Sequence, residues 1–102
     1  MLDIAELHQR ATGVSVAKVL PCEGDYIVLL DYHQASQVRL WANLRRARSN
    51  GDVVWAASTP SSSDMFTDVE WRDGRLIAWT WECFMITLDP GTGQFVEKVC
   101  TK

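Results

Sequence analysis

Turn signals that contain glycine divide most of this 102-residue chain into pairs of short apolar strands. The segments are "PCEGD" (21–25), "SNGD" (49–52), "RDGR" (72–75) and "PGTG" (90–93). Asn-Gly and Asp-Gly pairs favour tight hairpin turns, because these residues tolerate the positive φ angles that such turns need. The sequence therefore predicts an all-β fold, an antiparallel meander of about eight strands.

The same turns fall into two halves that align with each other, which indicates an internal repeat. "SVAKVLPCEGDYIVLL" aligns with "FTDVEWRDGRLIAWT", and "NLRRARSNGDVVW" aligns with "FMITLDPGTGQFVEK". The equivalent positions are Gly24 and Gly74, Leu44 and Ile86, and Gly51 and Gly93. We interpret residues 1–102 as one domain with two four-stranded sheets, residues 14–57 and 65–100. The first unit carries an inserted loop around "DYHQASQVRL", and "STPSSSD" links the two units.

A short amphipathic helix is predicted at residues 1–13, before the first strand. Asp3 can cap it, and Glu6 follows three residues later, as in a capping box. Gly13 provides a stop signal, because glycine readily adopts the left-handed conformation that ends many helices. The helix is expected to cover an open face or edge of the sheet.

The second hairpin of each half carries a family resemblance. "MITLDPGTGQFVEK" resembles the strand, turn and strand of quinoprotein-like β-propeller repeats, in which a Leu-Asp pair, a Thr-Gly pair and an apolar strand close each blade. "LRRARSNGDVVW" is similar and ends in its tryptophan, so the resemblance covers residues 15–100 as two propeller-blade-like units. It implies that Trp55 and Trp71 close the blades. A propeller needs about four or more blades, so the resemblance implies neither a quinone cofactor nor enzyme activity for one chain.

Charge argues against nucleic-acid binding. The chain has 13 acids and 10 bases, with a formal net charge of −3, whereas a nucleic-acid binder normally shows a basic excess over a whole face. The main basic cluster is Arg39, Arg45, Arg46 and Arg48. We interpret these arginines as a solvated strand and turn.

Neither a metal site nor a membrane segment is expected. The three cysteines, Cys22, Cys83 and Cys100, and the two histidines, His8 and His33, form no local pair at metal-ligand spacing. The odd cysteine number fits reduced thiols, and Cys83 is expected to be a buried, inert thiol. The start of the chain lacks the pattern of a signal peptide, and no apolar run has spanning length. These features predict a cytoplasmic protein without cofactors.

The strand "LIAWTW" is apolar on both faces, which is unusual for an isolated sheet. Ile77, Trp79 and Trp81 alternate along one side, so Trp79 is expected to pack in the core. For Trp81, core packing and a partner surface are both open interpretations, because tryptophan is frequent among interface hot spots.

Two functional classes remain, and both are non-enzymatic. The first is a protein-binding module, such as an immunity or inhibitor protein that covers a toxin or enzyme. The second is a self-assembling β protein, expected as a twofold homodimer with a ligand groove at the subunit seam. The candidate partner-binding residues are Asp68, Glu70 and Glu82, which would meet a basic partner, and Tyr32, Trp41 and Trp81, which would line a groove.

Overall fold

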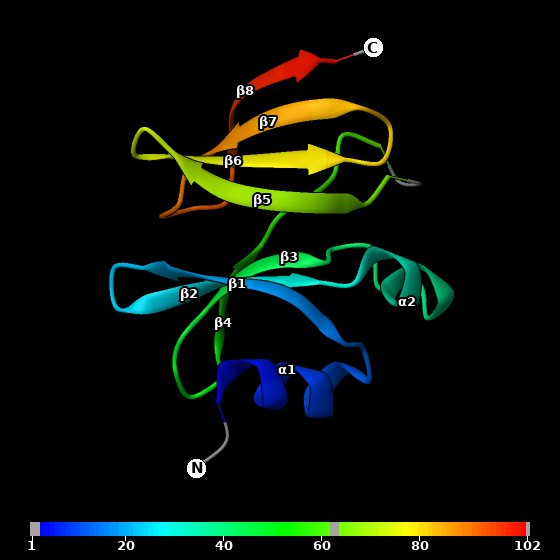
Figure 1. Cartoon of the computed structure of the whole chain (residues 1–102), viewed down its shortest axis with the longest axis vertical. Helices are drawn as coiled ribbons and strands as arrows, with labels where there is room; N and C mark the ends of the chain where they lie inside the picture. Colours follow the sequence, from blue (N-terminus) through cyan, green and yellow to red (C-terminus); the bar gives the residue numbers. More distant parts are fainter. Residues whose placement is uncertain (1–2, 62–63, 102) are drawn as a thin grey trace.

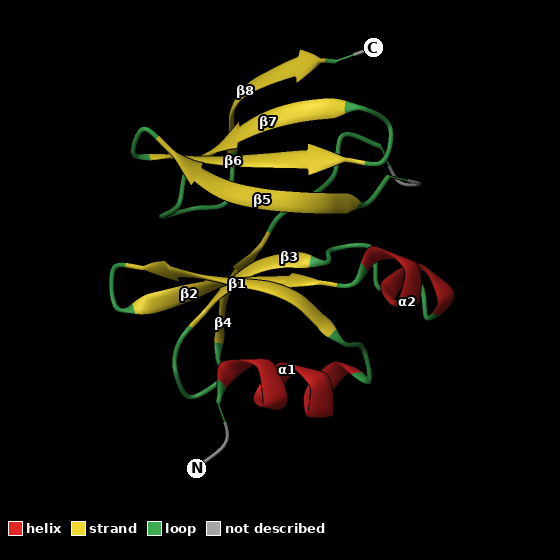
Figure 2. Cartoon of the chain, viewed as in Figure 1, coloured by secondary structure: helices red, strands yellow, loops and turns green. Residues whose placement is uncertain are grey.

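The protein folds into two four-stranded antiparallel sheets and two short helices (Figures 1 and 2). A computed structural model describes residues 3–61 and 64–101. The first unit comprises α1 (Ile4–Thr12), β1 (Val16–Cys22), β2 (Asp25–Leu30), α2 (Tyr32–Gln37), β3 (Leu44–Ala47) and β4 (Val53–Ala56). The second unit comprises β5 (Phe66–Arg72), β6 (Arg75–Thr80), β7 (Phe84–Leu88) and β8 (Phe95–Cys100). In each sheet the strands pair in chain order, which confirms the predicted fold class.

The N-terminal helix α1 has the ends that its sequence predicts. The Asp3 side chain accepts a hydrogen bond of 2.9 Å from the backbone N–H of Glu6. At the other end Gly13 has a φ of 73°, and its N–H donates to the carbonyl of Gln9. Residues 1 and 2 of the expected helix, and residues 62 and 63 of the expected linker, lie outside the described residues.

A second helix, α2, occupies the segment for which a loop is expected. Asp31 caps it by accepting a hydrogen bond of 3.0 Å from the N–H of Gln34, and Ala35, on the inner side of the helix, is fully buried. The placement of His33 in a loop is therefore wrong, because this histidine lies within the first turn of α2. A helix of six residues is too short to show a clear helical period in the sequence.

The two sheets repeat each other in hydrogen-bond register. Val16 pairs with Leu30 as Phe66 pairs with Thr80, and a bulge follows at the same place in both hairpins. A second bulge interrupts β3–β4 and β7–β8 at equivalent positions. The expected equivalence of Leu44 and Ile86 is wrong by one residue, since Leu29 pairs with Leu44 and its counterpart Trp79 pairs with Met85. The reason is that the β7–β8 turn is one residue longer than the β3–β4 turn.

Two apolar clusters stabilise the stack. One lies between the sheets and buries Ile27, Leu29 and Leu44 from the first sheet against Phe66, Leu76 and Ile86 from the second, among others. The other lies on the far face of the first sheet, where α1 covers it (Figure 1); it includes Ile4, Val14, Val28 and Ala47. The first sheet is thus covered on both faces.

Polar groups fix the position of one sheet on the other. Asn43 is fully buried, and its amide donates to the carbonyls of Leu30 and Phe66 and accepts from the N–H of Phe66. The indole N–H groups of Trp55 and Trp71 each donate, at 2.8 Å, to a proline carbonyl of the opposite unit, those of Pro90 and Pro21. These tryptophans therefore join the two units, one from each side.

Candidate functional site

The face of the second sheet that points away from the first sheet is the candidate functional site. We call it the outer face; its residues are Glu70, Arg72, Arg75, Ile77, Trp79, Met85, Thr87, Glu97 and Val99. Pairing register relates it to the face by which the first sheet packs on the second. Ile77, Trp79 and Met85 correspond to Ile27, Leu29 and Leu44, which are all buried between the sheets. The two sheets are therefore stacked in the same sense, like repeats in a series.

The outer face lies at the uncovered end of that series. Both described helices pack beside the first sheet (Figure 2). Side chains from β5 to β8 form a shallow hollow there, lined among others by Arg75, Ile77, Met85, Glu97 and Val99. Ile77 is only 6% exposed, because its neighbours on the sheet shield it, whereas the charged residues around it reach solvent. The face thus has an apolar centre and a charged rim, which is the usual anatomy of an interface.

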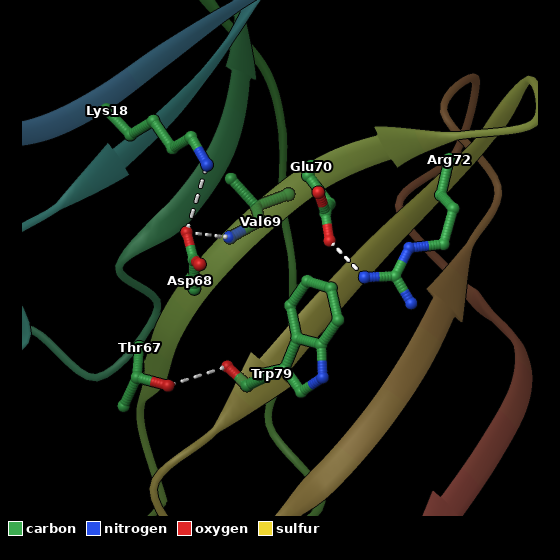
Figure 3. A network of polar contacts seen from close by, with 7 residues as sticks. All are labelled: Lys18, Thr67, Asp68, Val69, Glu70, Arg72 and Trp79. Carbon is green, nitrogen blue, oxygen red and sulfur yellow. Dashed lines mark hydrogen bonds and ion pairs between the residues drawn. The ribbon is translucent and has the colours of Figure 1, made fainter.

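One half of the charged rim is already paired within the chain. The Arg72 guanidinium donates to the Glu70 carboxylate, and its central carbon lies 5.2 Å from the centroid of the Trp79 ring (Figure 3). Arginine over an indole face is held by the ring quadrupole. Trp79 is therefore half-buried under a cation on the outer face, and the expectation that it packs in the core between the sheets is wrong, because Leu76 and Ala78 occupy that side of β6.

The other half of the rim is unpaired. Arg75 and Glu97 are exposed and line the same hollow, and within residues 3–61 and 64–101 neither takes part in an ion pair. Neither residue was expected from the sequence, and the same holds for Met85 and Val99. These residues share a face with Ile77, since side chains alternate along each strand. Recognising this from the sequence requires the register in which the strands pair.

The structure brings together two of the three aromatic candidates. The ring centroids of Tyr32 and Trp81 are 5.5 Å apart, at an interplanar angle of 34°. Trp81 follows β6 and is 62% exposed, so it does not pack in the core. Trp41 lies in the connection between α2 and β3, where it lines a separate hollow with the segment 57–61.

The three acidic candidates do not form one acidic patch. Asp68 lies 3.1 Å from the ammonium of Lys18 on the first sheet, and Glu70 pairs with Arg72 (Figure 3). Glu82 accepts a hydrogen bond of 2.6 Å from the Ser61 hydroxyl in the linker. Each acid therefore has a partner within the chain, and the cations beside Asp68 and Glu70 reduce the negative field that these two acids offer to a basic protein.

The arginine cluster is not a solvated strand and turn throughout, so that interpretation is wrong for Arg45 and Arg46. Arg46 donates to Asp25 at 3.0 Å and to the Pro90 carbonyl at 2.8 Å, which ties β3 to the second unit. Arg45 lies on the face covered by α1, and burial lowers the pKa of its guanidinium. Its Nε and the Nε2 of His8 are buried without a hydrogen-bond partner among the described residues.

The pKa of His8 reflects the burial of the face that α1 covers. Burial lowers the pKa of its imidazole; its contact with the Ile4 carbonyl opposes this change, and the charge of Arg45 adds to the lowering. No comparable buried imidazole lies among the described residues of the second sheet.

The cysteines are distributed differently from what is expected. Cys22 is buried between the sheets, and burial raises the pKa of its thiol. Cys83 is exposed in the β6–β7 turn with a φ of 70°, so the expected buried strand position is wrong. Across the described ranges, no three potential ligands from His, Cys, Asp and Glu lie close enough to hold a metal ion.

Among the described residues, neither helix has the length and apolar character to cross a membrane.

Comparison with known proteins identifies a domain family. No curated protein and no solved structure matches the chain significantly. One family model, described as "Domain of unknown function (DUF7957)", matches residues 11–99, which include both sheets. The chain therefore belongs to the DUF7957 domain family.

Proposed function

We propose that the protein is a small, non-enzymatic, cytoplasmic protein-binding module whose docking surface is the outer face of the second sheet. The observation that carries this proposal is the register equivalence between the outer face and the buried face of the first sheet. The face of the first sheet that contains Ile27 and Leu29 packs against the second sheet. The equivalent face of the second sheet, which contains Ile77 and Trp79, points toward solvent. In its apolar centre, Trp79 and Met85 remain partly exposed beside the buried Ile77, and covering them by a partner removes further apolar surface from water.

The surface also favours a partner of mixed charge over a strongly basic one. The outer face carries two acids, Glu70 and Glu97, and two bases, Arg72 and Arg75. An inhibitor that captures a basic enzyme through Asp68, Glu70 and Glu82 would first have to break the contacts of these acids with Lys18, Arg72 and Ser61. We therefore place the docking surface on the outer face rather than on the acidic residues.

The relation to propeller blades is part of the same proposal. Propeller blades present the same face to each successive neighbour, and the two sheets of this protein are stacked in that sense. This supports the interpretation of the sheets as blade-like units, of which the second has one face left for a partner to cover.

Site-directed photo-crosslinking in cells that naturally produce the protein tests the proposal. A photoreactive residue replaces Thr87, at the middle of the outer face, and a matched one replaces Arg10, which is exposed on α1. We expect position 87 to form a covalent adduct with a protein. Mass spectrometry then identifies this partner, which is either a second copy of the chain or a different protein. No adduct from position 87, or equal adducts from positions 87 and 10, would contradict the proposal.

A further inference from the structure

We infer that the partner on the outer face is a second copy of this chain, related by a twofold axis, with Arg75 of each copy against Glu97 of the other. This inference rests on the proposed role of the outer face as a docking surface. It replaces an unspecified protein partner with one of known sequence, and it names the two contacts that set the register.

Head-to-tail growth of the stack is blocked. In a continued series, a third sheet would pack on the outer face of the second. It would have to use the same face with which the second sheet packs on the first. The equivalent face of the first sheet, which contains Val16, Val28 and Ala47, is the one that α1 covers. A second copy therefore has only its own outer face to offer, and two identical faces that meet form a closed, twofold interface.

The charges on the outer face suit such a pairing. In a twofold interface, a contact between residues i and j occurs twice, so a face that carries both acids and bases can be complementary to itself. Asp73, in the turn before β6, lines the same hollow as a further acid. Glu70 and Arg72 already satisfy each other within one chain. Arg75 and Glu97 remain, of opposite sign and without an ion pair among the described residues.

The positions of these two residues agree with burial of the apolar centre. Arg75 begins β6, and Glu97 lies on β8 at the level of Ile77, because Ile77 pairs with Thr87 and Thr87 pairs with Glu97. On an ideal sheet, with strands about 4.8 Å apart and about 3.3 Å per residue, the twofold axis that exchanges Arg75 and Glu97 crosses β7 near Thr87 and passes close to Trp79. Trp79 then faces its own symmetry mate across the axis, and the sheets cross at a steep angle, as in orthogonal sheet packing.

Charge reversal with subunit mixing tests the inference. The variants are Arg75→Glu and Glu97→Arg, with Arg10→Glu on α1 as a control of equal charge change. We expect the unmodified protein and the control to sediment as dimers at about 100 μM, where a dimer with a micromolar dissociation constant is almost fully associated. Each outer-face variant alone should raise the dissociation constant at least about tenfold, because like charges meet in both symmetry-related contacts.

Mixing the two variants gives the decisive result. In a one-to-one mixture, glutamates at positions 75 and 97 of one chain meet arginines at positions 97 and 75 of the other, so we expect a heterodimer by native mass spectrometry. Recovery of association also shows that each variant is folded, and a contact within one chain cannot produce it. Dilution series give the dissociation constants of all these proteins. A monomeric unmodified protein, single variants that both dimerise as tightly as the unmodified protein, or a mixture that associates no more tightly than either variant alone would each overturn the inference. If position 87 then crosslinks to a different protein, the proposed docking function still stands.

Discussion

The distal faces of the two sheets, the ones that point away from each other, are opposite faces of the repeat, and they differ in what covers them. On the first sheet, Val16, Val28 and Ala47 lie in the cluster beneath α1. On the second sheet, the distal face carries Ile77, Trp79 and Met85 within a rim of four charges. The first face is covered by a helix of the same chain. The second face has an apolar centre that a partner could cover, and its charged rim favours exposure to water when no partner is bound.

This difference shows what decides whether a repeat ends or continues. On the first sheet, apolar side chains such as Val28, Leu30 and Ala47 pack together with Ile4 of α1. On the second sheet, Met85 and the charged Arg75 line an open hollow that no described helix covers. Terminal repeats of stacked proteins usually need a polar cap, and within residues 3–61 and 64–101 a helix covers the end at the first sheet but not the end at the second.

The largest expected effect comes from truncating equivalent positions on the buried and the outer face. Leu44→Ala should lower the free energy of unfolding by about 2–5 kcal/mol, because Leu44 is fully buried between the sheets and leaves a cavity. Met85→Ala, at the equivalent position of the half-exposed outer face, should cost about 1 kcal/mol, since it removes less buried apolar surface. Urea unfolding at low protein concentration measures both.

The protein concentration acts as the control in that comparison. Association on the outer face would add stability that depends on concentration, and Met85→Ala would then become more costly as the concentration rises. Equal losses of unfolding free energy for the two variants at every concentration would show that the outer face is as tightly packed as the interior, so the two faces would not differ as expected.

A smaller effect is expected at two glycines that share one backbone conformation. Gly74 and Gly93 both have a φ of 76°, so alanine at either position meets the same strain of about 1–2 kcal/mol. A Cβ at Gly74 would meet nothing within 4 Å, whereas at Gly93 it would lie 2.5 Å from the Trp55 ring. Gly93→Ala should therefore cost about 1–3 kcal/mol more than Gly74→Ala, because it overpacks the contact between the two units.

The background variant Trp55→Leu isolates that contact. With the indole removed, the cost of Gly93→Ala should fall toward the cost of Gly74→Ala, as measured by the same urea unfolding. A difference that persisted without the indole would mean that the Gly93 turn is constrained by its own backbone rather than by the first sheet.

Most of the fold could be predicted from the sequence because its signals are local. The turns at Gly24 and Gly74, and the cap at Asp3, act within a few residues of chain, so they can be recognised without knowing the tertiary contacts. The helix α2 could not be recognised, since its stability comes from burial of Ala35 and from the cap at Asp31 rather than from a repeated pattern. A one-residue difference between two turns was enough to shift the alignment of Leu44.

The candidate site was less predictable because it depends on strand register. Tyr32 and Trp81 were identified by residue type, and the structure brings them within contact distance. Arg75 and Glu97 have ordinary sequence surroundings, and they share a hollow only because β7 pairs with β6 on one side and β8 on the other. Arg45 shows the reverse case: its residue type predicted exposure, but the helix α1 covers it.

The smallest expected effect is a pH dependence that belongs to the covered face. His8 lies on the buried side of α1, where burial lowers the pKa of its imidazole below the usual 6.5. The unfolded chain then binds a proton at His8 at a higher pH than the folded chain does, so the free energy of unfolding should fall as the pH drops from about 7.5 through 6.5 to about 5.5. His8→Leu should reduce this fall, whereas Gln9→Leu, which adds the same side chain at an exposed position of α1, should leave it unchanged. Urea unfolding at a series of pH values gives both slopes. If His8→Leu retained the full slope, the imidazole would be exchanging protons freely in the folded state, and the face beneath α1 would be as accessible to water as the outer face of the second sheet.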